Sequence, residues 1–200
     1  MIVIGVTGGV GSGKSALLEK IAEKYRCRII YSDDAAKQTE KPGGLSYESI
    51  VELLGKDILD EEGVIINSKM AAKIFADSEL LKKTNAIIHP AVKQYILNEI
   101  EAEKELGKVE LFIIEAALLI EDGYDKICDE LWYVYAPTEI RRARLKESRG
   151  YTDEKIDRMF DSQLTEEEFR KGCKRVIDNG GTIDAAIDQV DDIMSELWRK

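Results

Sequence analysis

A glycine-rich loop that ends in a lysine and a serine lies near the start of the 200-residue sequence. An apolar run at residues 2–6 precedes it, and helix-forming residues follow from Ala16. In a strand–loop–helix of this kind, backbone N–H groups surround phosphate oxygens, the lysine reaches the β- and γ-phosphates, and the serine hydroxyl binds Mg²⁺. This context distinguishes the motif from a chance glycine turn and predicts a nucleoside triphosphate site. The expected nucleotide contacts are Gly9, Gly11, Ser12, Gly13, Lys14, Ser15 and Ala16.

Two acidic residues follow apolar segments that have the composition of strands. Glu115 ends the segment 111–115, and Asp33 follows the segment 28–31. Carboxyl ends of parallel strands meet at one edge of a sheet, so both acids are expected beside the glycine loop. Glu115 is suited to hold Mg²⁺ through water, although an acid at a strand end that contacts solvent is the alternative. Asp33 is suited to orient and deprotonate an acceptor hydroxyl, and the alternative is that Ser32 or Asp33 caps the next helix.

A cluster of cations interrupts an otherwise acidic chain. The net charge is −10, yet residues 140–149 carry five cations and one acid, a local net charge of 5 − 1 = +4. A guanidinium group can bind two phosphate oxygens at once, so we expect at least one of these residues to contact the triphosphate. A solvated, salt-bridged helix face is the alternative for each one. The cations are Arg141, Arg142, Arg144, Lys146 and Arg149.

His89 is the one histidine of the sequence. A multi-histidine metal site is therefore excluded. Apolar neighbours at 87–88 and 91–92 favour a hydrogen-bonded histidine in a core or groove.

Composition narrows the class of protein further. A net charge of −10 disfavours a nucleic-acid partner, which the bulk of the surface would repel. The apolar runs fall far short of the roughly 20 residues that span a bilayer, and no signal peptide is expected before the first strand. Three scattered cysteines form neither a metal spacing nor an even disulfide set, which favours a reduced, cytoplasmic location. We expect no membrane partner and a monomer or weak homo-oligomer.

Short apolar segments alternate with helical ones along the chain. This order predicts an α/β fold with a parallel, five-stranded sheet. The expected strands are 2–6, 28–31, 111–115, 131–135 and 175–178. The expected helices are 14–25, 33–39, 46–54, 68–75, 78–105, 137–148, 153–161, 166–171 and 183–199.

The same pattern predicts a single domain, residues 1–200, with two helical insertions. Its core would comprise residues 1–40, 108–137 and 175–200. Residues 41–107 would form an acceptor-binding cap, and residues 138–174 a charged helical lid. A cap and a lid over the carboxyl edge of a sheet indicate a kinase that closes over two substrates.

Six motifs in this order resemble the dephospho-CoA kinase family over nearly the whole chain. The glycine loop is shared by many proteins, whereas the His-Pro-x-Val motif at 89–92 and the Leu-Leu-x-Glu motif within 117–121 are more specific. The motifs are the loop at 7–15, the acidic motif at 32–36, residues 89–92, residues 117–121, Gln163, and the Val-Ile-x-Asn-x-Gly-like segment at 176–181.

The resemblance implies a three-layer P-loop NTPase fold and a specific reaction, in which the ATP γ-phosphoryl group passes to the ribose 3′-hydroxyl of dephospho-CoA. It implies that Asp33 is the base, that Arg144 and Arg149 are lid arginines, and that Asn179 lies near adenine. Magnesium is the implied cofactor, held by Ser15 and, through water, by Glu115. Lys14 and Arg144 join Asp33 as catalytic residues. Acceptor contacts are implied for Asp33, His89, Leu118, Leu119 and Glu121.

Several positions depart from the family pattern. Tyr31 stands where many members have an acid, which leaves Asp33 as the matching carboxylate. Lys37 replaces a frequent histidine and Ala117 a proline, while Glu115 replaces an aspartate and Ala16 a threonine. Two other functions stay open at this point: a kinase for another small nucleotide or hydroxyl acceptor, and a GTP-dependent switch. The sequence lacks the Asn-Lys-x-Asp guanine-reading motif of such switches, which counts against the second.

Overall fold

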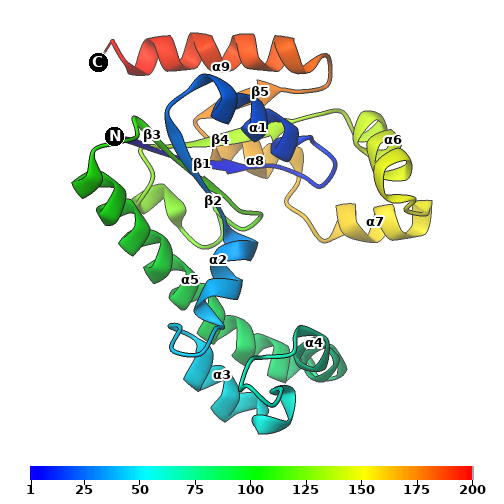
Figure 1. Ribbon diagram of the computed structural model, residues 1–200. Helices are drawn as coiled ribbons and strands as arrows, with labels where there is room; N and C mark the ends of the chain where they lie inside the picture. Colours follow the sequence, from blue (N-terminus) through cyan, green and yellow to red (C-terminus); the bar gives the residue numbers. More distant parts are fainter. Residues whose placement is uncertain (200) are drawn as a thin grey trace. The chain divides into compact units, whose positions relative to one another are not determined.

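In the computed structural model, which describes residues 1–199, the strands form one five-stranded sheet with the order β2-β3-β1-β4-β5 (Figure 1). The pairs β1–β3, β1–β4 and β4–β5 are parallel, so the expected α/β architecture with a parallel sheet is confirmed. The strands are β1 (Ile2–Thr7), β2 (Cys27–Tyr31), β3 (Leu111–Glu115), β4 (Glu130–Tyr135) and β5 (Arg175–Asp178).

The helices lie within two residues of the expected bounds at each end. Two short 3₁₀ turns, η1 (Lys56–Ile58) and η2 (Tyr124–Lys126), were not expected from the periodicity. The helices are α1 (Lys14–Lys24), α2 (Ser32–Thr39), α3 (Tyr47–Leu54), α4 (Asn67–Ala76), α5 (Ser78–Leu106), α6 (Thr138–Arg149), α7 (Asp153–Asp161), α8 (Glu166–Gly172) and α9 (Ile183–Leu197).

The chain divides into two compact units. The first contains residues 1–29 and the chain from Gly107 onward, and the second contains residues 30–106. The glycine loop and the lid segment 138–174 belong to the first unit. The cap segment 41–107 falls in the second unit apart from its last residue.

The core of the first unit lies along the central strands. Ile4, Phe112 and Trp132 are fully buried, as expected for parallel strands that are covered on both faces. Helices α1 and α9 pack side by side (Figure 1) and bury apolar stripes that include Leu17 and Val190. This burial fixes the start of α1, where the glycine loop ends.

The second unit has a separate apolar core. It is built from α3, η1, α4 and the segment between η1 and α4, and the α5 residues Ile87 and Ile88 pack against it. The two isoleucines directly precede His89, whose side chain is half-buried. The buried members of this cluster are Ile50, Leu54, Ile58, Ile65 and Met70.

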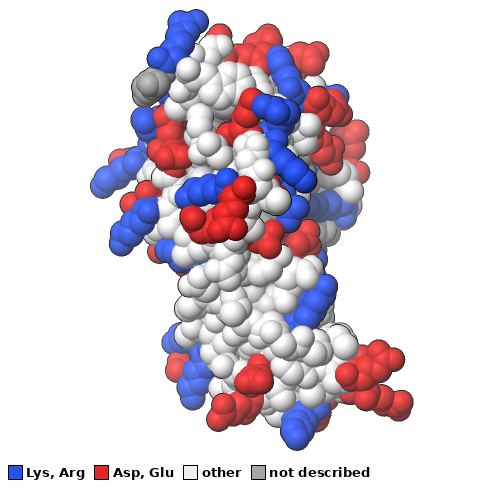
Figure 2. Space-filling model, turned by 60° about the vertical axis from the view of Figure 1, so that its left-hand side comes forward, with Lys and Arg blue, Asp and Glu red and all other residues white. Residues whose placement is uncertain are grey.

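The surface carries both signs of charge. In the view of Figure 2, acidic and basic side chains are interspersed, so the net charge of −10 is not gathered in one patch on this face. No helix within residues 1–199 combines the length and the apolar composition that crossing a bilayer requires.

A buried glutamate joins β4 to β5. The Glu130 side chain is 2% exposed, and its Oε1 lies 2.7 Å from Lys174 Nζ. Its Oε2 accepts hydrogen bonds from Trp132 Nε1 and Arg175 Nε, both at 3.2 Å. Burial raises the pKa of Glu130, but the hydrogen bonds from Lys174, Trp132 and Arg175 outweigh it and leave the pKa below the ordinary value.

We predict that Glu130→Gln lowers the free energy of unfolding by about 1–3 kcal/mol, because a buried charge network loses its anion. The folded-state pKa of Glu130 is depressed, so its stabilisation is present above the unfolded-state pKa of about 4.3 and is lost as the pH falls further. The difference between wild type and variant in urea unfolding should therefore shrink at acid pH.

Glu196→Gln is the matched control. Glu196 also contacts Arg175, at 2.8 Å, but its side chain is 57% exposed. We expect a loss below about 1 kcal/mol from this exposed pair. Equal losses for the two variants, or a Glu130→Gln difference that does not depend on pH, would contradict the prediction.

Candidate functional site

The glycine loop connects the end of β1 to the start of α1. Gly11 and Gly13 have φ values of 80° and 86°, which side chains with a Cβ disfavour. Gly13 caps α1, and a Cβ there would lie 2.4 Å from Asn179 Nδ2. The loop therefore needs glycine both for its backbone conformation and for the close approach of its neighbours.

Lys14 is a largely buried cation at the first position of α1, with its side chain 14% exposed. Its Nζ donates a hydrogen bond to Gly8 O at 2.7 Å and lies 3.7 Å from Glu115 Oε1. Burial lowers the pKa of Lys14; Glu115 opposes this shift, and the nearby Arg141 and Arg149 charges add to it. A desolvated cation interacts more strongly with an anion than a hydrated one does.

Asn179 and Arg144 hold the loop from outside. Asn179 Nδ2 donates to Ser12 O at 2.7 Å, and Arg144 Nη1 donates to the same oxygen at 3.2 Å. Arg144 Nη2 also donates to Asn179 O at 2.8 Å. These hydrogen bonds connect the loop to the end of β5 and to α6. Asn179, the residue expected near adenine, is 3% exposed.

The remaining cations of α6 are divided between the loop and α7. Arg142 forms ion pairs with Asp153 and Asp157, and Lys146 pairs with Asp153, so the salt-bridge alternative is confirmed for these two. Arg141 instead donates to Val10 O of the loop at 2.9 Å. From the sequence alone, Arg141 could not be distinguished from the other basic residues of α6 as the one that bonds the loop.

Arg149 ends α6 and is exposed. Its guanidinium carbon lies 5.9 Å from the centre of the Tyr151 ring. Its charge is close enough to lower the pKa of Lys14. Arg149 therefore belongs to the electrostatic surroundings of the loop.

Asp33 and His89, the expected acceptor residues, lie in the second unit. Asp33 is exposed in the first turn of α2, and Tyr31 occupies the N-cap position. The alternative that Ser32 or Asp33 is the N-cap residue is therefore wrong. The neighbouring Asp34 pairs with Lys37 at 2.7 Å.

The residues of the Leu-Leu-x-Glu motif differ in exposure. Leu118 is 42% exposed, and Glu121 is also exposed. Leu119 is fully buried, and its Cδ1 lies 3.0 Å from the position that a Cβ at Gly5 would take. The Leu119 side chain thus packs in the core, while Leu118 and Glu121 are accessible.

Oxygen atoms suited to a hard cation border the loop. Glu115 ends β3 beside Lys14, and Ser15 is exposed in the first turn of α1. Within residues 1–199, no group of three or more His, Cys, Asp or Glu side chains converges on one point. Magnesium commonly uses one or two protein oxygens together with substrate phosphates, and this donor set fits that chemistry.

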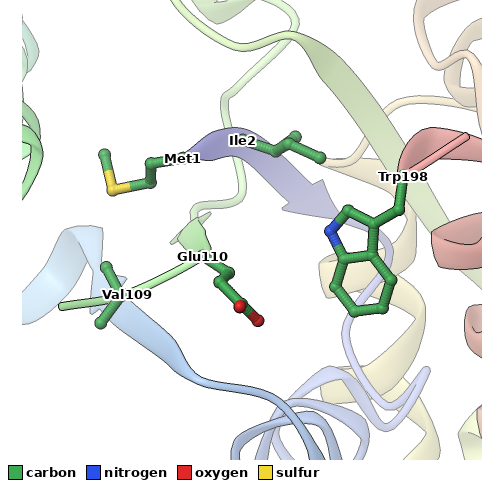
Figure 3. A pocket seen from close by; sticks show the side chains of 5 residues that line it. All are labelled: Met1, Ile2, Val109, Glu110 and Trp198. Atoms are coloured by element: carbon green, nitrogen blue, oxygen red, sulfur yellow. The ribbon is translucent and has the colours of Figure 1, made fainter. Parts of the chain in front are cut away.

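A separate pocket of about 570 Å³ lies at the opposite edge of the sheet. It is formed where β1 and β3 begin, and Figure 3 shows the Glu110 carboxylate pointing toward the Trp198 indole. The glycine loop follows the other end of β1, so this pocket is not part of the phosphate site. Its lining residues are Met1, Ile2, Val109, Glu110 and Trp198.

We predict that Asn179→Ala raises the KM for ATP by about tenfold, since Ser12 O loses its strongest donor and the loop loses order before nucleotide binds. Steady-state kinetics with varied ATP measures this effect. Asp178→Ala is the control, because Asp178 lies beside Asn179 but its side chain accepts a hydrogen bond from Gly180 N–H and not from an atom of the glycine loop. An unchanged KM for Asn179→Ala, or an equal rise for Asp178→Ala, would contradict the prediction.

Comparison with known proteins identifies the family to which this arrangement belongs. A sequence model described as CoaE, dephospho-CoA kinase, matches residues 2–185. The dephospho-CoA kinase of Aquifex aeolicus is 38% identical over 197 residues, which cover 98% of this chain and 97% of that protein.

Solved structures agree on the fold. A dephospho-CoA kinase from Campylobacter jejuni superposes with a TM-score of 0.70 at 22% identity, over 96% of each chain. A shikimate kinase from Bacteroides thetaiotaomicron gives a TM-score of 0.58 at 12% identity, over 97% of this chain and 98% of that one. These two likenesses show a P-loop kinase fold, and the family match together with the Aquifex relative shows that the chain belongs to the dephospho-CoA kinase family, transferases that phosphorylate dephospho-CoA to coenzyme A with ATP.

Proposed function

We propose that this chain transfers the γ-phosphoryl group of ATP to the ribose 3′-hydroxyl of dephospho-CoA, with its own residues in the following roles. The observation that carries the proposal is the buried Lys14, which lies between the Gly8 carbonyl and the Glu115 carboxylate. Phosphoryl transfer depends mainly on positioning and charge neutralisation, and a fixed, desolvated cation supplies both.

The donor site is formed by the glycine loop and the lid. The nucleotide phosphates bind the Lys14 ammonium group and the backbone of the loop and the first turn of α1. The residues in contact are Gly9, Gly11, Ser12, Gly13, Lys14, Ser15 and Ala16. Arg144 and Arg149 approach the phosphates from α6, and Arg144 acts as the catalytic lid arginine. The hydrogen bonds of Arg144 to Ser12 O and Asn179 O support this role, because they hold its guanidinium group beside the loop. The segment around Asn179 contacts the adenine.

The magnesium site uses Ser15 directly and Glu115 through water. Bound Mg²⁺ would neutralise charge on the β- and γ-phosphate oxygens. The position of the Glu115 carboxylate, 3.7 Å from Lys14 Nζ, supports this assignment, since it stands beside the residue that binds the same phosphates.

The acceptor site belongs to the cap, residues 41–107, together with the residues at its borders. Asp33 orients the 3′-hydroxyl and takes its proton, and its exposure in the first turn of α2 leaves the carboxylate accessible. His89, Leu118 and Glu121 contact the acceptor, and Leu119 supports Leu118 from the core. The lid, residues 138–174, closes over the phosphates.

The proposal includes a cytoplasmic location and a monomeric or weakly homo-oligomeric state. Cys27, Cys128 and Cys173 are not joined in disulfides, which suits a reducing compartment. Burial raises the pKa of Cys173 to about 12, so this thiol is expected to be unreactive at neutral pH.

We predict that Asp33→Asn lowers kcat by about 10²–10⁴-fold while ATP binding stays nearly intact, because a positioned base is lost and the phosphate site is not touched. Single-turnover kinetics and equilibrium ATP binding measure the two effects separately. Asp34→Asn is the matched control, since Asp34 is exposed and paired with Lys37. Unchanged turnover for Asp33→Asn would remove this residue from the mechanism.

The choice of acceptor is a separate prediction. In a coupled ADP-release assay with Mg·ATP, we expect a kcat/KM for dephospho-CoA at least about 10³-fold above those for AMP and shikimate, since a site that hydrogen-bonds its acceptor rejects analogues that leave those groups unpaired. Shikimate is included because a shikimate kinase shares the fold. Faster phosphorylation of an acceptor without the pantetheine arm would overturn the substrate assignment. Tight GTP binding without ATP turnover would instead support a nucleotide-dependent switch.

A further inference from the structure

Both backbone polar groups of Val10, in the glycine loop, are bonded by side chains of the lid segment. Gln163 Oε1 accepts from Val10 N at 3.1 Å, and Arg141 Nε donates to Val10 O at 2.9 Å. The same Gln163 oxygen also accepts from Arg141 Nη2 at 2.9 Å. The three residues therefore form a closed ring of hydrogen bonds between the loop and the lid.

Besides these hydrogen bonds, the Arg141 guanidinium group packs against Gly9 and the Phe160 ring. It lies against Gly9, where an added Cβ would come within 2.3 Å of Nη2. Its carbon is 4.3 Å from the centre of the Phe160 ring, a cation–π contact with α7. Burial lowers the pKa of Arg141, and the Arg141 charge in turn lowers the pKa of Lys14. Arg141 is thus a partly desolvated cation beside the phosphate-binding lysine.

Arg142, the next residue of the same helix, shows that this placement is specific. Its guanidinium group pairs with Asp153 and Asp157 of α7, and its pKa is raised by those hydrogen bonds. One residue thus ties α6 to α7, and its neighbour ties α6 to the loop. A variant of Arg142 tests the contact between α6 and α7, and a variant of Arg141 tests the contact between α6 and the loop.

We propose that Arg141 and Gln163 form a clip that holds the two peptide groups on either side of Val10 in the conformation that receives the ATP phosphates, so that both are positioning residues for nucleotide binding. A glycine-rich loop loses much conformational entropy when it is ordered, and the clip makes that loss part of folding instead of binding. The planar guanidinium fork suits this task, because one Arg141 side chain bonds the loop carbonyl and Gln163 together.

The test is a KM-against-kcat comparison on the full chain, with saturating dephospho-CoA. We expect Arg141→Met and Gln163→Met each to raise the KM for ATP by about tenfold and to change kcat by less than about threefold, as expected when binding is lost equally in ground and transition states. Gln163→Glu keeps an acceptor oxygen for Val10 N–H and Arg141, so its KM should rise less than that of Gln163→Met, even though it adds a negative charge beside the loop. Arg142→Met is the control and should also leave the KM unchanged.

The double variant decides whether the two residues act as one unit. Because either single change opens the ring, Arg141→Met with Gln163→Met should be no worse than the more affected single variant. Additive effects would overturn the proposal, as would a large fall in kcat at constant KM or an equal rise in KM for Arg142→Met. If Arg141→Met does not fold in a thermal melt, the comparison of Gln163→Met with Gln163→Glu still decides the role of Gln163 and the clip.

This inference rests on the proposed ATP site, and the two fail in different ways. If the proposed function is wrong, the wild-type chain does not turn over ATP with dephospho-CoA. If only the clip is wrong, the wild type turns over normally and the variants do not show the expected KM pattern.

Discussion

The phosphate site depends on how the carbonyl groups of the glycine loop are bonded. Ser12 O accepts from Asn179 and Arg144, and Val10 O accepts from Arg141. A loop with several glycines is costly to order, and side chains that grip its carbonyl oxygens from outside fix its path. The nucleotide therefore binds to a loop that is already ordered in the folded protein. Such preorganisation is required for strong electrostatic stabilisation in phosphoryl transfer.

The sheet order explains why these side chains can reach the loop. β1 pairs with β4, and β4 pairs with β5, so the residues that follow each strand meet at one edge. Asn179 comes directly after β5, and α6 begins shortly after β4. Parallel topology thus brings together residues separated by more than a hundred positions, and the apolar burial of the strands provides the energy that holds this edge in place.

The sequence predicted most of the fold because burial and local pattern determine it. Buried parallel strands have continuous apolar sequences, which predicted their positions. The glycines followed by Lys14 and Ser15 predicted the phosphate-binding loop. The site was predictable only in part. Both faces of α6 are basic, so periodicity could not tell Arg141, which bonds the loop, from Arg142, which pairs with α7. The side chain of Asn179 is a similar case, since its hydrogen bond to Ser12 O depends on a strand end 167 residues away.

The charges around the glycine loop favour a highly charged anion. Before nucleotide binds, Lys14 has one carboxylate partner among its closest contacts, Glu115, while the charges of Arg141 and Arg149 act against it. The charges of Lys14 and Arg141 are therefore undercompensated, and the partial burial of these two side chains reduces screening by solvent. A triphosphate with Mg²⁺ relieves this repulsion, whereas a neutral ligand gains nothing from it. Since the molecule as a whole carries a charge of −10, the local field at the loop, and not the overall charge, selects the ligand.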